Sequence, residues 1–256
     1  MTMLVALASA ALVAIIAYRI RLLSASGMIP ATLVGAATVI GGAQWVVLLL
    51  FFFISSSAIG VWRGAERDRL VGALIEKGGR RDAAQVLANG LVFALAAAFS
   101  NFGSVDAWQA VGAGAIAAAT ADTWSTEVGT VLGGAPRLIL SGRQVPPGTS
   151  GGVTLAGTAS GIVAAVLVSL VVMLVDWETP LLAIIAGGVV GFIVDSVIGA
   201  TIQERRWCET CSLDTERRIH RCGTQTVQRG GIRGVNNDAV NLAGTIAGAA
   251  VTWILI

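Results

Sequence analysis

Charged residues are scarce in this sequence of 256 residues: only 12% are Asp, Glu, Lys or Arg, whereas 55% are hydrophobic and the mean hydropathy is +0.79. A soluble domain carries about a quarter charged residues, so the composition excludes an ordinary soluble fold. Aromatic residues are also few, at 6%, while the sequence contains 32 glycines. Small residues let helices approach closely in lipid. We therefore expect an all-α, polytopic integral membrane protein.

The apolar runs predict about eight transmembrane helices, separated by polar or glycine-rich breaks. Their predicted ranges are 2–18, 28–42, 44–62, 83–101, 106–121, 153–175, 180–202 and 237–255. No basic residue precedes the first range, and Arg19 and Arg21 follow it, which favours a retained span over a cleaved signal peptide. We expect a single membrane domain over residues 1–256, with a cytoplasmic loop at residues 203–234.

Lysine and arginine are absent from one set of connections, GGAQ, NFGSV and VDWETP. With eight spans, all 17 basic residues fall on the opposite side of the membrane. The positive-inside rule then predicts that this side is cytoplasmic and that both termini lie outside. We expect the cell membrane of a prokaryote. The charge-alternating stretch 63–81 predicts an amphipathic or solvated helix at the membrane surface, which either anchors the protein or binds phosphate.

The predicted spans contain no Lys or Arg that could neutralise a carboxylate in lipid. Asp122 and Glu127 directly follow the apolar run VGAGAIAAAT, and Asp195 lies about 10 Å inside the cytoplasmic boundary at ~1.5 Å per residue. A carboxylate at such a depth is costly unless it faces protein, water or a metal. Asp195 must be protonated, hydrogen-bonded or bound to a cation, which makes it the best single metal-ligand candidate. Asp122 has an alternative role, as the N-cap of the next segment.

Other polar residues reach the same side of the membrane on shared helical faces. They are Asp82, Gln85 and Asn89 at the start of the fourth span, Asp195 and Gln203 with Gly199 at the end of the seventh, and Asn237 and Asn241 with Gly244 at the start of the eighth, with Asp238 beside this last face. Such faces are explained equally well by contacts between helices and by a wet cavity.

No lysine follows the glycine-rich stretch PPGTSGGVTLAGTASG, so it is not a Walker A motif. Gly148, Gly151 and Gly152 expose backbone N–H groups beside Thr149 and Ser150, just before a helix begins. This arrangement can cradle an anion. Glycine-rich loops are common in helical membrane proteins, so the stretch alone is a weak indication.

Cysteine and histidine are nearly absent, and all of them lie within 15 residues: Cys208, Cys211, His220 and Cys222. The CxxC and HxC spacing suits a tetrahedral zinc site with four protein ligands, which is typical of a structural site. A disulfide is disfavoured on the cytoplasmic side. The alternative is a set of free thiols with an incidental histidine.

Together, GRRDAAQVLANG, ADTWSTEVG, GTSGGVTLAGTASG, DSVIGATIQ and NNDAVNLAGT resemble the transmembrane protein 19 family, formerly a domain of unknown function, which includes the plastid phytyl-phosphate kinase of plants. The resemblance covers nearly the whole chain from residue 27, and the Cys/His stretch resembles the prokaryotic members only. It implies a kinase that transfers a phosphoryl group from a nucleoside triphosphate, with CTP as one candidate, to an isoprenoid monophosphate. Phytyl or geranylgeranyl phosphate would then give the diphosphate.

On this resemblance we expect Asp122 and Asp195 to hold Mg²⁺, with Glu127 and Asp238 assisting them as catalytic carboxylates. The predicted substrate-binding residues are Asp82, Gln85, Asn89, Thr123, Gly148, Thr149, Ser150, Gly151, Gly152, Ser196, Gln203, Asn237 and Asn241. The isoprenoid tail is expected between the glycine-rich spans. The expected partners are a nucleoside triphosphate, an isoprenoid monophosphate and membrane lipids. Nucleic acid is not expected, and a homodimer is left open.

Two other classes of function compete with the kinase. A transporter or lipid flippase for a phosphorylated or isoprenoid substrate also carries intramembrane carboxylates and glycine-rich helices. However, the sequence shows no internal repeat, and its polar residues gather at one membrane face. A membrane scaffold that recruits partners through a zinc lobe leaves Asp195 unexplained.

Overall fold

Nine helices account for most of the chain in the computed structural model, which describes residues 3–256. They are α1 (Met3–Arg19), α2 (Met28–Gly41), α3 (Ala43–Trp62), α4 (Gly64–Val71), α5 (Ala83–Phe99), α6 (Val105–Leu132), α7 (Leu155–Leu174), α8 (Leu181–Thr201) and α9 (Asn237–Ile254). Eight of them coincide with the eight predicted apolar ranges. Their ends agree within two residues everywhere except at the end of α6.

Three of the helices, α3, α7 and α8, are long and apolar enough to cross a membrane, judged by length and composition. Helices α1, α2 and α5 are also apolar but shorter. Large hydrophobic side chains cover the outside of the bundle; Leu182, for example, is 80% exposed. Such a surface is unfavourable in water and suits contact with lipid tails.

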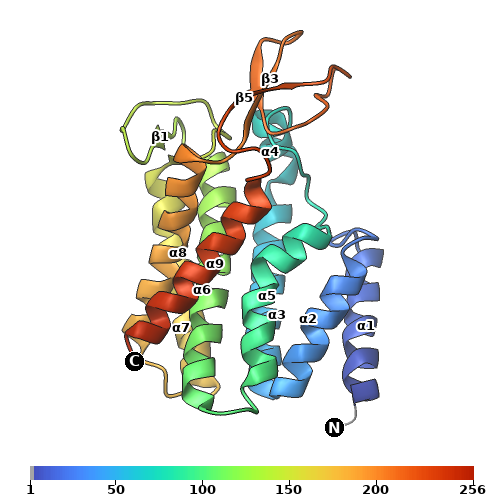
Figure 1. Ribbon diagram of the computed structural model, residues 1–256, viewed down its shortest axis with the longest axis vertical. Coiled ribbons are helices and arrows are strands. Elements are labelled where there is room, and N and C mark those ends of the chain that lie inside the picture. Colours follow the sequence, from blue (N-terminus) through green and yellow to red (C-terminus); the bar gives the residue numbers. More distant parts are fainter. Residues whose placement is uncertain (1–2) are drawn as a thin grey trace.

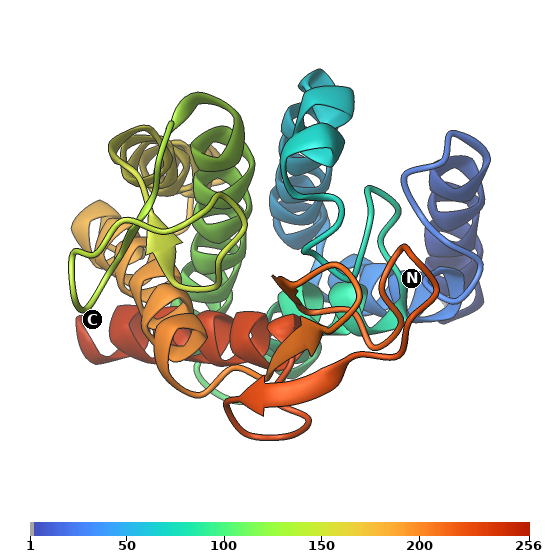
Figure 2. The ribbon, with the colours of Figure 1, turned by 90° about the horizontal axis from the view of Figure 1, so that it is seen from above.

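Helix α6 occupies the centre of the bundle and packs against α3, α5, α7, α8 and α9 (Figures 1 and 2). All its residues from 112 to 121 are buried, and most of them are alanine or glycine. A helix buried on every side needs small residues if its neighbours are to approach closely. A Cβ on Gly114 would lie 2.4 Å from the carbonyl oxygen of Gly248, and one on Gly191 would lie 2.3 Å from Cβ of Ala118.

The predicted end of this span at residue 121 is wrong, because α6 continues without a break to Leu132. The extension is polar, and its hydroxyls bond back to the helix: Thr123 donates to the carbonyl of Ala119 at 2.8 Å and Thr130 to that of Thr126 at 2.7 Å. Local bonds of this kind satisfy the side chains without interrupting the backbone ladder.

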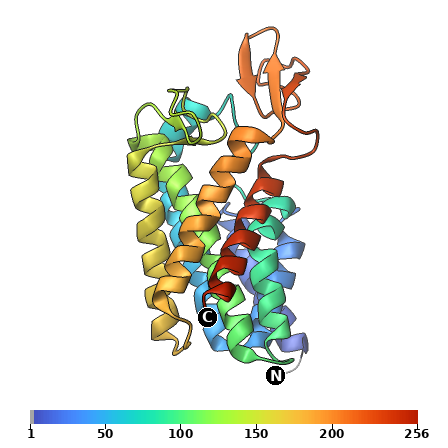
Figure 3. The same ribbon diagram turned by 60° about the vertical axis from the view of Figure 1, so that its left-hand side comes forward.

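Every strand within residues 3–256 lies at one end of the bundle (Figures 1 and 3). Strands β1 (Arg137–Leu138) and β2 (Gly152–Val153) pair in antiparallel fashion, and the three-stranded antiparallel sheet has the order β4-β3-β5. Its strands are β3 (Arg205–Cys208), β4 (Leu213–Thr215) and β5 (Val227–Gly230). The fold is therefore mostly helical, and the all-α prediction fails in the pair β1–β2 and in the small lobe, residues 203–234. The start of α1 and the end of α9 lie at the opposite end of the bundle.

Hydrogen bonds attach the lobe to the turn that follows α4. Thr215 donates from its hydroxyl and Glu216 from its backbone N–H to the carbonyl of Leu74, at 2.9 and 2.8 Å. Arg217 donates to the carbonyl of Gly72 at 3.0 Å. The helix predicted over residues 63–81 is limited to α4; a local turn follows it, in which the carbonyls of Gly72 and Leu74 accept hydrogen bonds from the lobe instead of from the next helical turn.

Candidate functional site

A polar cavity of about 470 Å³ opens at the end of the bundle that carries the strands, and residues of α4 to α9, the loop before α7 and the lobe form its wall. The predicted site residues in this wall are Gln85, Gly148, Thr149, Ser150, Gly151, Gly152, Asp195, Ser196, Gln203, Asn237 and Asp238. The others, which do not form the wall, are Asp82, Asn89, Asp122, Thr123, Glu127 and Asn241. The predicted segments on α5, α8 and α9 and the glycine-rich loop each supply at least one predicted residue, whereas α6 contributes only neighbours of its predicted residues, such as Ser125 and Thr126.

Asp195 borders this cavity from α8, and α9 holds its carboxylate in position. With its amide oriented to suit its neighbours, Asn241 donates to Oδ2 of Asp195 at 2.9 Å and to the carbonyl of Asn237 at 3.0 Å. The two helices can meet here because both Gly191 and Gly244 lack a side chain; a Cβ on Gly244 would lie 3.0 Å from the Gly191 carbonyl oxygen. Asp195 is therefore hydrogen-bonded, which is one of the three states that its depth allowed.

Asp122 and Glu127 lie on α6, behind the cavity wall. Asp122 lies well inside the helix, so it does not act as an N-cap. Its carboxylate interacts electrostatically with Asp195 on α8 and with Glu127 on its own helix. Glu127 forms an ion pair with Nε of Arg67 at 3.0 Å, and Arg67 in turn borders the cavity. Thr123 bonds within α6 and points no donor into the cavity.

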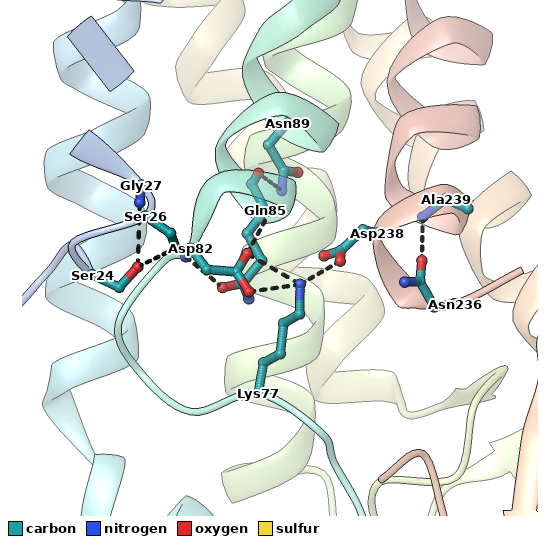
Figure 4. Close-up of polar contacts among 10 residues, drawn as sticks. All are labelled: Ser24, Ser26, Gly27, Lys77, Asp82, Gln85, Asn89, Asn236, Asp238 and Ala239. Carbon is teal, nitrogen blue, oxygen red and sulfur yellow. Dashed lines mark hydrogen bonds and ion pairs between the residues drawn. The ribbon is translucent and has the colours of Figure 1, made fainter. Parts of the chain in front are cut away.

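Lys77 joins two carboxylates from different helices (Figure 4). Its Nζ lies 2.9 Å from Oδ2 of Asp82, the N-cap of α5, and it also contacts Oδ2 of Asp238 at the start of α9. Oδ1 of Asp238 is buried and has no hydrogen-bond partner among residues 3–256. Burial alone would lower the pKa of Lys77, but the hydrogen bonds to Asp238 and Asp82 outweigh it and raise that pKa. Lys77 therefore keeps its charge at the cavity wall.

The predicted polar face of α5 divides into two parts. Asp82 and Gln85 form a capping box: the Asp82 carboxylate accepts from the Gln85 backbone N–H at 3.0 Å, and the Gln85 side chain accepts from the Asp82 N–H at 3.1 Å. Partial burial would raise the pKa of Asp82, but the Gln85 N–H and the Lys77 ammonium together lower it. Asn89 lies deeper and donates to the carbonyl of Gln85 at 3.1 Å, while its buried Oδ1 finds no hydrogen-bond partner among residues 3–256.

The glycine-rich loop borders the cavity, but some of its N–H groups are already used. Gly148 and Gly151 have φ of +83° and +75°, a conformation that favours glycine. The Gly152 N–H donates to the carbonyl of Thr149 at 3.0 Å, and the Thr149 N–H donates to that of Pro146 at 3.2 Å. The loop therefore offers fewer free donors to an anion than its sequence indicated.

Several charged residues of the cavity were not predicted. Glu216 of the lobe accepts hydrogen bonds from Ser150 at 3.1 Å and from Gln203 at 2.7 Å, and burial raises its pKa. Lys77, Arg67 and Arg218 also form part of the wall. In the sequence these three are basic residues near or in loops, a pattern that ordinary positive-inside anchoring also explains. Glu216 is distant from the spans in the sequence and reaches the bundle only because the lobe docks on it.

The four Cys and His residues of the lobe gather in one cluster. The Sγ atoms of Cys208, Cys211 and Cys222 and a ring nitrogen of His220 all lie within 4.8 Å of one another. Sγ of Cys208 is 3.6 Å from Sγ of Cys222, which is too long for a disulfide. Ligands about 2.0–2.3 Å from one tetrahedral ion are separated by such distances. The cluster can therefore hold a metal such as zinc.

Comparison with known proteins agrees with this architecture. A family model described as integral membrane protein DUF92 matches residues 8–249. The chain is 34% identical over 173 residues to the uncharacterized membrane protein MJ0933 of Methanocaldococcus jannaschii, covering 67% of this chain but only 60% of that protein. It is 27% identical over 272 residues to Protein PGR of Arabidopsis thaliana, covering 95% of this chain and 92% of the plant protein. No solved structure matches it.

Proposed function

The chain belongs to the DUF92 family of integral membrane proteins, the transmembrane protein 19 family that its motifs resemble, and we propose that it is a membrane-embedded isoprenoid-phosphate kinase. It would transfer a phosphoryl group from a nucleoside triphosphate, with CTP as one candidate, to a monophosphate such as phytyl or geranylgeranyl phosphate. The product would be the isoprenoid diphosphate.

The observation that carries the proposal is the mixed charge of the polar cavity at the end of an apolar bundle. Its wall contains five carboxylates and four cations: Glu76, Asp195, Glu204, Glu216, Asp238, Arg67, Lys77, Arg206 and Arg218. Phosphoryl transfer between two anionic groups needs both signs of charge, because the cations neutralise phosphate while carboxylates bind the divalent ion that bridges phosphates. A site for an uncharged substrate would need neither.

The orientation of the protein is part of the proposal. Eight spans, α1 to α3 and α5 to α9, would place the polar cavity, α4 and the lobe in the cytoplasm of a prokaryote and both termini outside. The basic loops lie at the same end of the bundle as the cavity, which supports this orientation. The cytoplasm would also supply the nucleotide.

The reaction would not require a protein base. A phosphate monoester has its second pKa near 6, so one of its oxygens is already ionised at neutral pH. That oxygen attacks the γ-phosphorus, the bond between this phosphorus and the β–γ bridging oxygen breaks, and the nucleoside diphosphate leaves with the electron pair. The protein has to place the two anions in line and neutralise their charge, which is the role of Arg67, Lys77 and Arg218.

The donor atoms at the cavity fit Mg²⁺, which takes oxygen ligands. Asp195 presents its carboxylate there with Asn241 holding one oxygen, and Asp238 has a buried oxygen without a partner. We assign Asp195 as the Mg²⁺ ligand at the cavity wall and Asp122, which lies behind that wall on α6, as the second ligand, with Asp238 and Glu127 assisting. When bound, Mg²⁺ would offset the negative charge of the phosphates. Zinc at the Cys/His cluster would have a structural role.

A phosphotransfer assay on the detergent-purified protein tests the proposal. Geranylgeranyl and phytyl monophosphate, and the corresponding alcohols, would be incubated with CTP or ATP and Mg²⁺, and the products identified by mass spectrometry. We expect diphosphate from the monophosphates and no product from the alcohols. If no acceptor and donor pair gives a product, the kinase is rejected, and flux of isoprenoid phosphate across reconstituted vesicles would test the transporter.

A further inference from the structure

A second cavity, the apolar groove, lies among α1, α2, α3 and α5 and has a volume of about 200 Å³. Helices α1 and α3 pack on different parts of α2 and form the two sides, while α2 and α5 form the floor (Figure 2). Its wall is almost entirely hydrocarbon, with Val13, Val34, Leu49 and Phe53 among the lining side chains. None of the proposed phosphotransfer steps uses this groove.

One end of the groove carries a cation, Arg81, that forms no ion pair among residues 3–256, although the charge of Glu127 also acts on it. The Arg81 guanidinium lies over the rings of Phe52 and Phe53, at 5.4 and 5.3 Å from their centroids, and donates to the Ser57 hydroxyl at 3.1 Å. No carboxylate forms an ion pair with it in the described part of the chain, residues 3–256. Burial lowers the pKa of Arg81 to about 10, so the side chain remains charged at neutral pH.

The backbone fixes Arg81 in this place. Its N–H donates to the carbonyl of Leu22 at 3.1 Å, and its carbonyl accepts from the Ser24 N–H at 2.9 Å. A desolvated guanidinium whose planar donors meet no carboxylate is a receptor for an anion such as phosphate. Asn89 adds a buried Oδ1 at the same groove, to which no donor in the described part of the chain bonds.

The groove adjoins the polar cavity, because Gln85 forms part of both walls. Lys77 and Arg81 come from one loop, the first bordering the polar cavity and the second the groove. An elongated molecule could therefore keep a hydrocarbon chain in the groove while its charged end reaches past Gln85 toward Lys77.

We propose that the apolar groove binds the tail of a single-chain isoprenoid phosphate and that Arg81 binds the phosphate where the groove meets the polar cavity. The identity of this ligand rests on the proposed kinase function. The single apolar groove with one cation at its polar end suits a ligand with one hydrocarbon chain and one phosphate, rather than a lipid with two acyl chains. The glycine-rich helices cannot hold the tail, because they are already in contact at Gly114, Gly191 and Gly248.

The site can be mapped without any nucleotide. The probe is geranylgeranyl monophosphate with a diazirine at the far end of its tail, photolysed with the purified full chain and analysed by peptide mass spectrometry. We expect labels on α1, α2 and α3 that unlabelled geranylgeranyl monophosphate competes away and that geranylgeraniol or dioleoyl phosphatidic acid does not. Labels spread over α7 and α8, or equal competition by phosphatidic acid, would overturn the proposal.

Two matched pairs of variants add a quantitative test by equilibrium binding of radiolabelled geranylgeranyl monophosphate. Val13→Trp fills the groove, whereas Val5→Trp changes an equally exposed valine of α1 outside it. Arg81→Gln removes the cation, whereas Arg80→Gln removes an exposed neighbour that borders neither cavity. We expect the first member of each pair to weaken binding at least tenfold and the second less than twofold. Equal effects within both pairs would contradict the proposal.

The outcomes separate this proposal from the kinase function. Specific groove labelling without phosphotransfer activity would keep the binding site and reject the kinase. Activity without groove labelling would keep the kinase and reject the site. Thermal unfolding of each variant identifies any loss of binding that arises from misfolding.

Discussion

The two cavities of this molecule adjoin at Gln85 but differ in how they are built. The polar cavity takes its charged wall residues from loops, the lobe and helices α4, α8 and α9, and it depends on long-range contacts such as those of Lys77 and Glu216. The apolar groove is made almost entirely by four helices. On the two proposals, we therefore expect tail binding to persist when the lobe is disturbed and phosphotransfer to be lost.

Asp195→Asn is expected to have the largest effect on the polar cavity. The amide would keep the size of the side chain but lose the charge of the proposed Mg²⁺ ligand, so we expect the rate of phosphotransfer to fall by at least about a hundredfold. Asp106→Asn, an exposed aspartate in the first turn of α6, is the matched control. Steady-state rates of the two variants would be compared, and equal rates would contradict the metal assignment.

Cys208→Ser should separate the two cavities. Loss of one ligand is expected to reduce zinc, measured by mass spectrometry of the metal, from about one ion per chain to almost none. The lobe would then release Glu216 and Arg218, and activity would fall by about tenfold or more, while tail labelling in the groove would remain. Chelation followed by zinc addition provides the control. Wild-type protein that contains no zinc would refute the structural-metal assignment.

Lys77→Met tests whether the bridge between α5 and α9 stabilises the cavity. It would leave Asp238, whose side chain is 9% exposed, without its cation. We expect a loss of about 2 kcal/mol in unfolding free energy, less than for a fully buried pair because Lys77 and Asp82 are partly exposed. Combining it with Asp238→Asn should recover part of this loss. Arg80→Met serves as the control, and additive effects in the double variant would argue against the bridge.

Gly151→Ala tests the fit of the glycine-rich loop against α8. The new Cβ would lie 2.5 Å from Cβ of Ala200, in a residue with φ of +75°, so both overpacking and backbone strain are expected, at about 2 kcal/mol together. Gly142→Ala has a similar φ of +66° with nothing within 4 Å, and should show the strain alone, about 1 kcal/mol. Thermal unfolding of the two variants measures how much more stability Gly151→Ala loses than Gly142→Ala.

The smallest expected effect is a pH dependence at Glu216. Burial raises its pKa, so its contribution to stability is present below the ordinary glutamate pKa and is lost as the pH rises through the folded value. The Glu216→Gln variant has no titrating carboxyl group at this position, so it lacks this loss of stability. From about pH 5 to about pH 8, its melting temperature should therefore fall less than that of the wild type. Parallel curves would show that Glu216 stays ionised in the folded protein.

Hydropathy could predict the helices because long apolar runs have few alternatives in lipid, and the glycine content predicted their close packing. The spacing of Cys208 and Cys211 likewise identified the metal cluster, since its ligands are neighbours in the sequence. The contacts of Lys77 and Glu216 could not be predicted, because the partners of Lys77 lie on α5 and α9 and those of Glu216 are reached only when the lobe docks on the bundle. The end of α6 was missed because its polar residues resemble a loop, although their hydroxyls bond within the helix.

The most direct test of the account follows the transferred group itself. Purified protein would be given geranylgeranyl monophosphate, Mg²⁺ and CTP or ATP labelled with ³²P in the γ-phosphoryl group, and the lipid product separated from nucleotide. The account predicts that the label enters geranylgeranyl diphosphate, with one labelled phosphoryl group in each product molecule. Label that remains in the nucleotide or appears only as inorganic phosphate, while the monophosphate is unchanged, would contradict it.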